Sequence, residues 1–153
     1  LINHYKLKKN SRVLDVGCAK GFLVKEFRKK GIEAYGIDIS TYALRHADES
    51  VKKNLFKSNA LKVPFVGNYF DLVISINTIH NLDEKNCIKA IKEILRVGKN
   101  KYFLQVDSYY NEKQKKIFED WVLTAKTYGY PYYWKKIFKS ANYDFDYYWT
   151  IMN

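Results

Sequence analysis

The residue types best suited to chemistry gather in one short stretch, Val13-Leu14-Asp15-Val16-Gly17-Cys18-Ala19-Lys20-Gly21. An apolar run ends in an acid and a glycine-containing bend, and a helical pattern follows at once. This order predicts a strand, a tight loop and a helix N-terminus, where backbone N–H groups can approach a nucleotide-like ligand. Gly17 and Gly21 can adopt left-handed backbone or permit packing that a β-carbon would block. The stretch is therefore the first candidate binding site.

The bend disfavours a ligand with phosphate groups. A dinucleotide fingerprint would carry glycines where Ala19 and Phe22 stand. A phosphate-binding loop would end in Gly-Lys-Ser/Thr, whereas Lys20 precedes Gly21 here. The Asp15 carboxylate would repel a pyrophosphate and attract a cationic amine. These features favour a nucleoside that carries positive charge and no phosphate.

A second acid, Asp38, ends the next predicted strand, Glu33–Asp38, and lies 21 residues after Gly17. At this spacing in nucleotide-binding βαβ units an acid accepts hydrogen bonds from a ribose. Its two carboxylate oxygens can take both sugar hydroxyls at once. The alternative is a cap for the following helix, a role that Ser40 fills better. We therefore expect Asp38 to bind a sugar.

Four segments together resemble class I S-adenosylmethionine-dependent methyltransferases. The bend from Val13 to Gly21 is similar to their first motif, with Ala19 in place of the commoner middle glycine. Tyr35–Ser40 fits the acid-ended second segment, and Ser58–Leu61 resembles the adenine-contacting segment, although Asn59 replaces the usual aspartate. Phe70–Val73 and the residues after it resemble the fourth motif. The Asn/Asp-Pro-Pro-Tyr/Phe signature of amino-directed enzymes is missing, which disfavours base or glutamine N-methylation.

The resemblance implies S-adenosylmethionine as cofactor, with S-adenosylhomocysteine as product. It places Asp15, Gly17, Ala19 and Gly21 at the methionine end, Asp38 at the ribose, Asn59 and Ala60 at the adenine, and Cys18, Ile39 and Asn77 among the remaining cofactor contacts. His80 follows the fourth predicted strand and is the candidate general base or substrate hydrogen-bond partner, because the pKa of histidine lies near neutral. A loop histidine that only packs beside the cofactor is the alternative.

Strands alternate with helices along the chain, which predicts an α/β fold with helices on both faces of a parallel sheet. Expected strands cover Arg12–Val16, Glu33–Asp38, Asn54–Lys57, Tyr69–Asn77, Lys101–Val106 and Tyr143–Met152; expected helices cover Lys20–Lys30, Thr41–Ala47, Asp83–Val97, Glu112–Trp121 and Pro131–Ala141. The resemblance implies a Rossmann-like three-layer sandwich with strand order 3-2-1-4-5-7-6 and an antiparallel last strand. Only one terminal strand is clear in the sequence.

Length and composition predict one domain over residues 1–153, and the start at Leu1 leaves room for a missing N-terminal segment. No apolar run is long enough to predict a membrane span. Cys18 and Cys87 are far apart, which indicates a reducing, cytoplasmic setting, and the histidines form no metal-ligand pattern. The net charge of +11 comes mostly from lysines, 23 of 27 basic residues, so we expect charge spread over solvated faces and do not favour a nucleic-acid partner.

We therefore expect methyl transfer from the sulfonium to an O, N or C nucleophile of a small-molecule acceptor, with a sugar as one option. A cofactor-binding module without methyl transfer and an RNA-directed methyltransferase remain as alternatives; a nicotinamide dehydrogenase is disfavoured by the glycine spacing. Eleven aromatic residues lie between Tyr128 and Trp149. They could form a substrate lid, but we expect them to supply core and sheet-edge packing.

Overall fold

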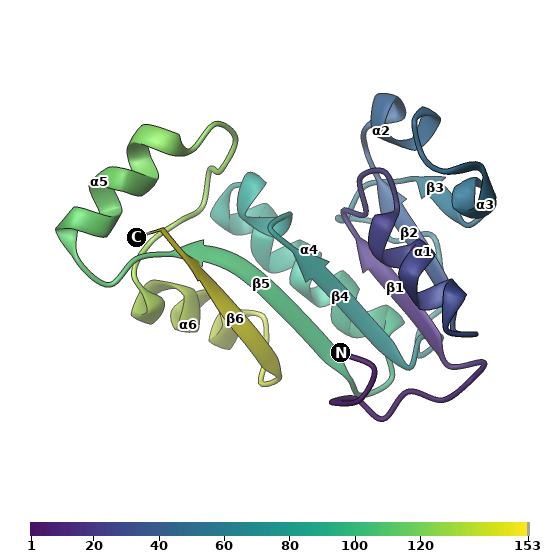
Figure 1. Cartoon of the computed structure of the whole chain (residues 1–153). Coiled ribbons are helices and arrows are strands. Elements are labelled where there is room, and N and C mark those ends of the chain that lie inside the picture. Colours follow the sequence, from purple (N-terminus) through teal and green to yellow (C-terminus); the bar gives the residue numbers. More distant parts are fainter. Residues whose placement is uncertain (153) are drawn as a thin grey trace.

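A computed structural model describes residues 1–152 as six strands in one sheet, flanked by helices. The elements are β1 Arg12–Val16, α1 Phe22–Lys29, β2 Glu33–Asp38, α2 Thr41–Arg45, α3 Glu49–Lys52, β3 Leu55–Lys57, β4 Leu72–Ile76, the 3₁₀ turn η1 Ile79–Asn81, α4 Glu84–Val97, β5 Tyr102–Ser108, α5 Glu112–Trp121, α6 Pro131–Ser140 and β6 Asp146–Ile151. The strand order is β3-β2-β1-β4-β5-β6, and every pairing is parallel (Figure 1).

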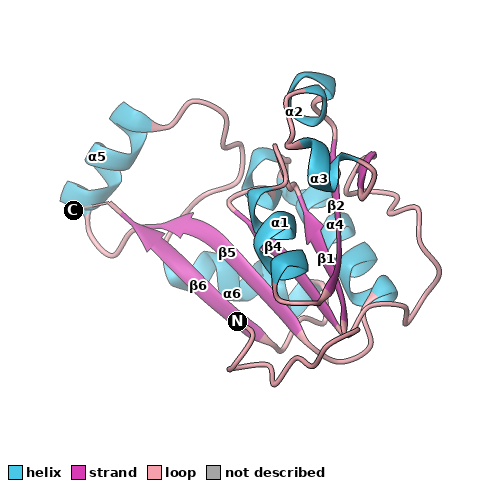
Figure 2. Ribbon diagram, turned by 45° about the vertical axis from the view of Figure 1, so that its right-hand side comes forward, coloured by secondary structure: helices cyan, strands magenta, loops and turns pink. Residues whose placement is uncertain are grey.

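Apolar side chains on the two faces of the sheet build two cores. Val13 and its face neighbours pack with Val24 and Phe27 of α1 and with α3. Leu14, on the opposite face, belongs to a larger cluster with α4 and α6 that includes the fully buried Trp134. Parallel strands covered on both sides need such near-continuous apolar runs. The three layers, visible in Figures 1 and 2, confirm the predicted α/β Rossmann-like class.

The helix limits follow local capping chemistry. Asp83 caps α4 by accepting a hydrogen bond from the Asn86 N–H at 3.0 Å, and Gly98 ends the helix, as the sequence predicts. The Ser40 hydroxyl likewise caps α2 through the Ala43 N–H, at 3.1 Å. Pro131 occupies the first turn of α6, where its missing N–H costs no helical hydrogen bond. The segment 122–128 forms neither helix nor strand.

The predicted strand order and direction are wrong at the edge of the sheet beside β5. β6 pairs directly with β5 and runs parallel to it, with Leu104 opposite Tyr147, whereas we expected order 3-2-1-4-5-7-6 and an antiparallel last strand. The reason lies in the connection: α5 and α6 both separate β5 from β6, and α6 packs on the same face as α4. A crossover through a helix returns the chain parallel to its starting strand, whereas an antiparallel neighbour needs only a hairpin.

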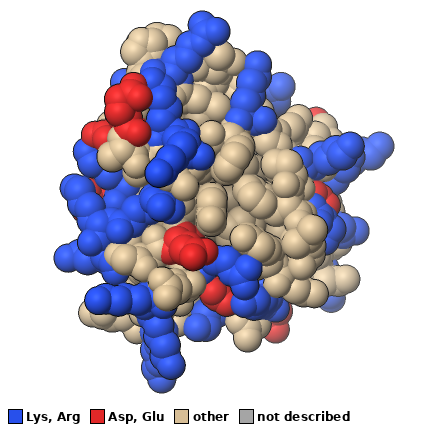
Figure 3. All heavy atoms as spheres, turned by 90° about the vertical axis from the view of Figure 1, so that its right-hand side faces the viewer, with Lys and Arg blue, Asp and Glu red and all other residues tan. Residues whose placement is uncertain are grey.

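The aromatic residues of the tail contribute to the core and to the β6 edge of the sheet, as expected. Phe138 of α6 stacks on Trp149 of β6 at 5.8 Å between ring centroids, and Trp134 of α6 is fully buried. α5 projects beyond the sheet and buries only Phe118 (Figure 2). Figure 3 shows Lys and Arg side chains distributed around an uncharged central area on the side of α2 and α3. Within residues 1–152, no helix has the length and apolar character needed to cross a membrane.

Candidate functional site

A cavity of about 440 Å³ opens at the carboxyl ends of β1, β2, β3 and β4, within the size range of small-molecule sites. Parallel strands bring their carboxyl ends to one edge, so segments far apart in the sequence meet there. The lining consists of strand ends and the residues just beyond them: Val16, Gly17, Ala19, Ile37, Asp38, Ile39, Ser58, Asn59, Ala60, Ile76, Asn77, Thr78, Asn81 and Leu82.

The glycine bend forms one wall because a larger residue would not fit. Gly17 has φ of 84°, and a Cβ there would come within 2.1 Å of the Thr78 hydroxyl oxygen. The bend therefore lies directly against the segment after β4, and both line the cavity. Ala19 also adopts a left-handed backbone, with φ of 47°. This conformation strains an alanine and is one reason that a glycine is commoner at that position.

Asp38 joins the bend to the end of β2. Its Oδ2 accepts a hydrogen bond from the Ala19 N–H at 2.8 Å, and its Oδ1 accepts one from the Ser40 N–H at 2.8 Å. A carboxylate offers about four acceptor positions, so each oxygen can still take a ligand hydroxyl. The carboxylate is thus oriented before a ligand arrives.

Asp15 is buried next to the bend and is not part of the cavity lining. It belongs to β1, opposite Gly36 and Ile74 of the neighbouring strands. Burial, together with the nearby Asp38 charge, raises the pKa of Asp15 to about 7. A cation bound in the nearby cavity would favour the charged form of this carboxyl, so Asp15 can act on a ligand through the electric field without touching it.

The loop after β3 supplies the far wall. The Asn59 Oδ1 accepts a hydrogen bond from the Leu61 N–H at 2.8 Å, which leaves the Nδ2 group as the available donor of this side chain. The Ser58 hydroxyl donates to the Lys62 carbonyl at 3.2 Å, and the Lys62 N–H donates to the Asn59 carbonyl at 3.1 Å. These bonds close a tight turn that presents Asn59 and Ala60 to the cavity.

The opposite wall follows β4. Asn77 has a left-handed φ of 48°, a conformation that asparagine tolerates, and its N–H donates to the Gln105 carbonyl at 2.9 Å. Its Oδ1 accepts a hydrogen bond from the Thr150 hydroxyl at 3.1 Å, so β6 helps to orient a cavity residue. Asn81 also lines the cavity, and its Oδ1 is buried without a hydrogen-bond partner in the described part of the chain.

His80 lies just behind this wall. Its side chain is 6% exposed, and Nδ1 is 3.4 Å from the Asp107 Oδ2. Burial lowers the pKa of His80, whereas the Asp107 charge opposes that shift. Its carbonyl accepts hydrogen bonds from the Lys126 and Thr127 N–H groups, at 2.9 and 3.0 Å, which ties η1 to the segment before α6. The imidazole is therefore a buried and oriented group beside the cavity, and burial favours its neutral form.

The structure brings most of the predicted site residues together. Of the ten expected cofactor contacts, seven line the cavity, namely Gly17, Ala19, Asp38, Ile39, Asn59, Ala60 and Asn77; Asp15, Cys18 and Gly21, like His80, lie outside the lining. Sequence reasoning missed Thr78, Asn81 and Leu82 and included Ser58 only as part of the adenine-contacting segment. Each follows the end of a predicted strand, and the rule that ligands bind at the carboxyl edge of a parallel sheet could have identified them.

The charge of the cavity is opposite to that of the molecule. The chain carries a net +11, yet Asp38 is the one charged residue in the lining, and neither Lys nor Arg contributes to it. A phosphate-bearing ligand would meet an acid and no cation there. A cationic nucleoside fits this arrangement, because its sugar can bind Asp38 while its positive charge is drawn toward Asp15 and Asp38.

Comparison with known proteins identifies the family. The methyltransferase-domain family matches residues 14–104, more than half of the chain and the part that builds the cavity walls. The chain belongs to this family. Its recognised motifs and parallel sheet make it a class I S-adenosylmethionine-dependent methyltransferase domain, which confirms the resemblance inferred from the sequence.

Individual relatives match only part of this chain and part of their own length. The uncharacterized protein MJ0638 of Methanocaldococcus jannaschii is 36% identical over 104 residues, which are 66% of this chain and 42% of that protein. Demethylmenaquinone methyltransferase of Lactiplantibacillus plantarum is 36% identical over 104 residues, covering 61% and 43%. The YcgJ protein of Bacillus subtilis superimposes with a TM-score of 0.74 at 18% identity, covering 92% and 64%, and shows the shared fold. The chain spans about half the length of the curated relatives it matches.

Proposed function

We propose that this domain binds S-adenosylmethionine in the cavity and transfers its methyl group to a small-molecule acceptor. The observation that carries the proposal is the lining itself: one acid, no cation, and polar loops at the ends of adjacent strands. The donor supplies an activated methyl group on its sulfonium. The domain has to bind and orient that donor, align the acceptor and exclude water, work that is worth several kcal/mol in well-aligned reactions.

Each wall has a part in this proposal. Asp38 accepts hydrogen bonds from the ribose hydroxyls, and Asn59 with Ala60 contacts the adenine edge. The bend at Gly17 and Ala19, with Cys18 and Gly21 supporting it, holds the methionine end. The buried carboxylate of Asp15 attracts the positive charge of that end. Asn77 and Ile39 complete the contacts. With the donor held there, the acceptor would bond to the methyl carbon as sulfur leaves with the electron pair, and the acceptor would lose its proton to a base.

His80 is our proposed proton acceptor on the substrate side. Nδ1 faces two groups of Asp107, the backbone N–H, which donates to it at 3.4 Å, and the carboxylate Oδ2, also at 3.4 Å. The proposal requires the tautomer that donates from Nδ1 to the carboxylate, because only then is Nε2 free to accept a proton. Burial lowers the pKa of His80, which favours the neutral imidazole that can accept a proton. His80→Ala should lower turnover while leaving affinity for S-adenosylhomocysteine within about twofold. Unchanged turnover would leave His80 with a packing role only.

The cofactor assignment is tested by calorimetric titration of the purified domain with S-adenosylhomocysteine and, separately, with NAD. We expect binding of the first and little or none of the second; equal or preferred binding of NAD would overturn the proposal. Methyl-labelled S-adenosylmethionine is then incubated with the small-molecule and RNA fractions of a cell extract. Label in the small-molecule fraction supports the acceptor class, label in RNA replaces it, and no transfer despite binding favours a cofactor-binding module.

A further inference from the structure

We infer that the ion pair between Glu93 and Arg96 on α4 positions the purine end of the cofactor site. The pair clamps the segment 58–66, hereafter the purine loop, and through it sets the position of Asn59 and Ala60. The inference rests on the proposed function, since it assigns adenine recognition to that loop. Neither residue lines the cavity, so both would act as positioning residues.

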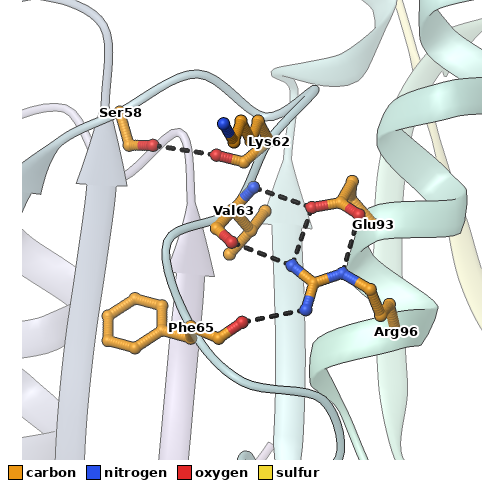
Figure 4. Close-up of polar contacts among 6 residues, drawn as sticks. All are labelled: Ser58, Lys62, Val63, Phe65, Glu93 and Arg96. Carbon is orange, nitrogen blue, oxygen red and sulfur yellow. Dashed lines mark hydrogen bonds and ion pairs between the residues drawn. The ribbon is translucent and has the colours of Figure 1, made fainter.

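The guanidinium group of Arg96 is the centre of the clamp (Figure 4). Its Nη1 donates to the Phe65 carbonyl at 2.9 Å, and its Nη2 donates to the Val63 carbonyl at 2.8 Å. Nε and Nη2 also donate to the two carboxylate oxygens of Glu93, at 2.7 and 2.8 Å. One planar side chain thus fixes the directions of two loop carbonyls relative to α4.

Glu93 completes the clamp from the other side. Its Oε2 accepts a hydrogen bond from the Val63 N–H at 2.8 Å, so both the N–H and the carbonyl of Val63 are held by side chains of α4 (Figure 4). The Glu93 side chain is 20% exposed and the Arg96 side chain 41% exposed, so the carboxylate side of the pair is the better shielded from competing water. A partly shielded, bidentate pair is worth more than an ordinary surface ion pair.

The choice of arginine supports a geometric role. The chain contains 23 lysines and four arginines, so most of its basic positions carry lysine and an arginine is unusual. A lysine at position 96 would provide a point charge, but it could not reach two carbonyls and a carboxylate in one plane. The fork of a guanidinium meets that requirement.

The clamp is connected to the cavity through a short, hydrogen-bonded segment. Val63 is buried in the core beneath α4, and it lies three residues after Ala60. Between them, the turn is closed by the bonds from Ser58 to Lys62 and from Lys62 to Asn59, the first of which Figure 4 shows. A shift at Val63 is therefore transmitted to Asn59 and Ala60 through these hydrogen bonds.

Recognition of adenine is the property that this arrangement would control. A hydrogen-bonding site discriminates between ligands only when its polar groups are held in place, because a mobile loop can rearrange to suit either ligand. S-inosylhomocysteine differs from S-adenosylhomocysteine in carrying an oxygen where adenine has its amino group. The preference of the domain for the adenine compound therefore reports how firmly the purine loop is held.

The test compares Arg96→Leu with the wild type and with Lys29→Leu. Lys29 forms an ion pair with Glu26 on α1, at the same three-residue spacing, and neither residue lines the cavity. We expect Arg96→Leu to weaken S-adenosylhomocysteine binding by about tenfold and to reduce the adenine-over-inosine preference by a similar factor. Arg96→Lys should fall between the wild type and Arg96→Leu, and Lys29→Leu should match the wild type in both measurements.

The outcomes separate this inference from the proposed function. If the wild type fails to bind S-adenosylhomocysteine, the proposed function is overturned and this inference with it. If the wild type binds and discriminates, but folded Arg96→Leu keeps the wild-type preference, the clamp has no positioning role. A loss of affinity that is equal for both ligands also overturns the inference, since it would reflect general destabilisation. Far-ultraviolet circular dichroism of each variant establishes that the protein compared is folded.

Discussion

The Asp38 carboxylate accepts a hydrogen bond from the Ala19 backbone N–H at 2.8 Å and thereby joins the ends of β2 and β1. The residue proposed to bind the sugar is thus hydrogen-bonded directly to the bend proposed to hold the amino-acid end. A change at Asp38 should disturb both ends of the ligand, because the acceptor for the sugar also fixes the strained backbone at Ala19.

Replacing Asp38 tests this coupling most directly. Asp38→Ala should raise the dissociation constant for S-adenosylhomocysteine at least about tenfold, since hydrogen bonds to a charged group are worth roughly 1.5–3 kcal/mol. Asp38→Asn, which keeps one acceptor oxygen, should lose less. Asp48→Asn is the control, because Asp48 caps α3 and does not line the cavity. Isothermal calorimetry measures all three, and an unaltered affinity in Asp38→Ala would remove the sugar-binding role.

The raised pKa of Asp15 predicts a pH dependence of stability. Its folded-state pKa of about 7 lies above the ordinary value of 3.8, so between about pH 4 and 7 the folded protein retains a proton that the unfolded chain releases. The contribution of Asp15 to stability therefore falls as the pH rises through this window. The melting temperature of Asp15→Asn relative to the wild type should increase from pH 5 to pH 8. A difference that stays constant with pH would show that Asp15 titrates normally.

Gly17 should tolerate no side chain. Gly17→Ala forces a left-handed alanine into contact with Thr78 and should abolish cofactor binding as well as destabilise the fold. Gly31→Ala is the matched control: Gly31 has φ of 76°, but its added Cβ would meet Lys9 at an ordinary 3.4 Å. The control should cost about 1–2 kcal/mol in urea unfolding, from backbone strain alone. Equal losses in the two variants would contradict the close approach at Gly17.

The buried His80 predicts a loss of stability in acid. Burial lowers its pKa below 6.5, so on acidification the unfolded chain takes up a proton before the folded protein does. Stability from this group is present above about pH 6.5 and is lost at lower pH. His80→Gln should therefore lose less stability than the wild type between pH 7 and pH 5. Thermal scans at the two pH values provide the comparison.

The sequence predicted the first half of the sheet well because each local signal there agrees with the global fold. β1 and β2 begin and end where expected, and Asp38 reaches the cavity at the predicted position. Apolar runs ending in acids, glycine bends and helix caps determine this part locally. The limits of β4 were less accurate: it starts at Leu72 rather than Tyr69, since Tyr69 and Phe70 donate their N–H groups to the Val97 carbonyl instead.

The tail was harder to predict because its arrangement depends on long-range packing. Alternating aromatic and polar residues indicated the strand β6, but the pattern carries no information on which way it runs beside β5. The direction follows from α6 packing beside α4. Similarly, no sequence signal connects Thr150 with Asn77, or Arg96 with Val63, until the fold brings them together.

Both native thiols are buried, and burial raises the pKa of Cys87 to about 12 and that of Cys18 still further. Alkylating reagents need a thiolate, so both should react slowly in the folded protein. A cysteine introduced at the exposed Ile39, on the cavity rim, would then be the preferred point of attachment for a fluorophore. The wild-type background is thus already suited to an optical reporter of ligand occupancy, without removal of either natural cysteine.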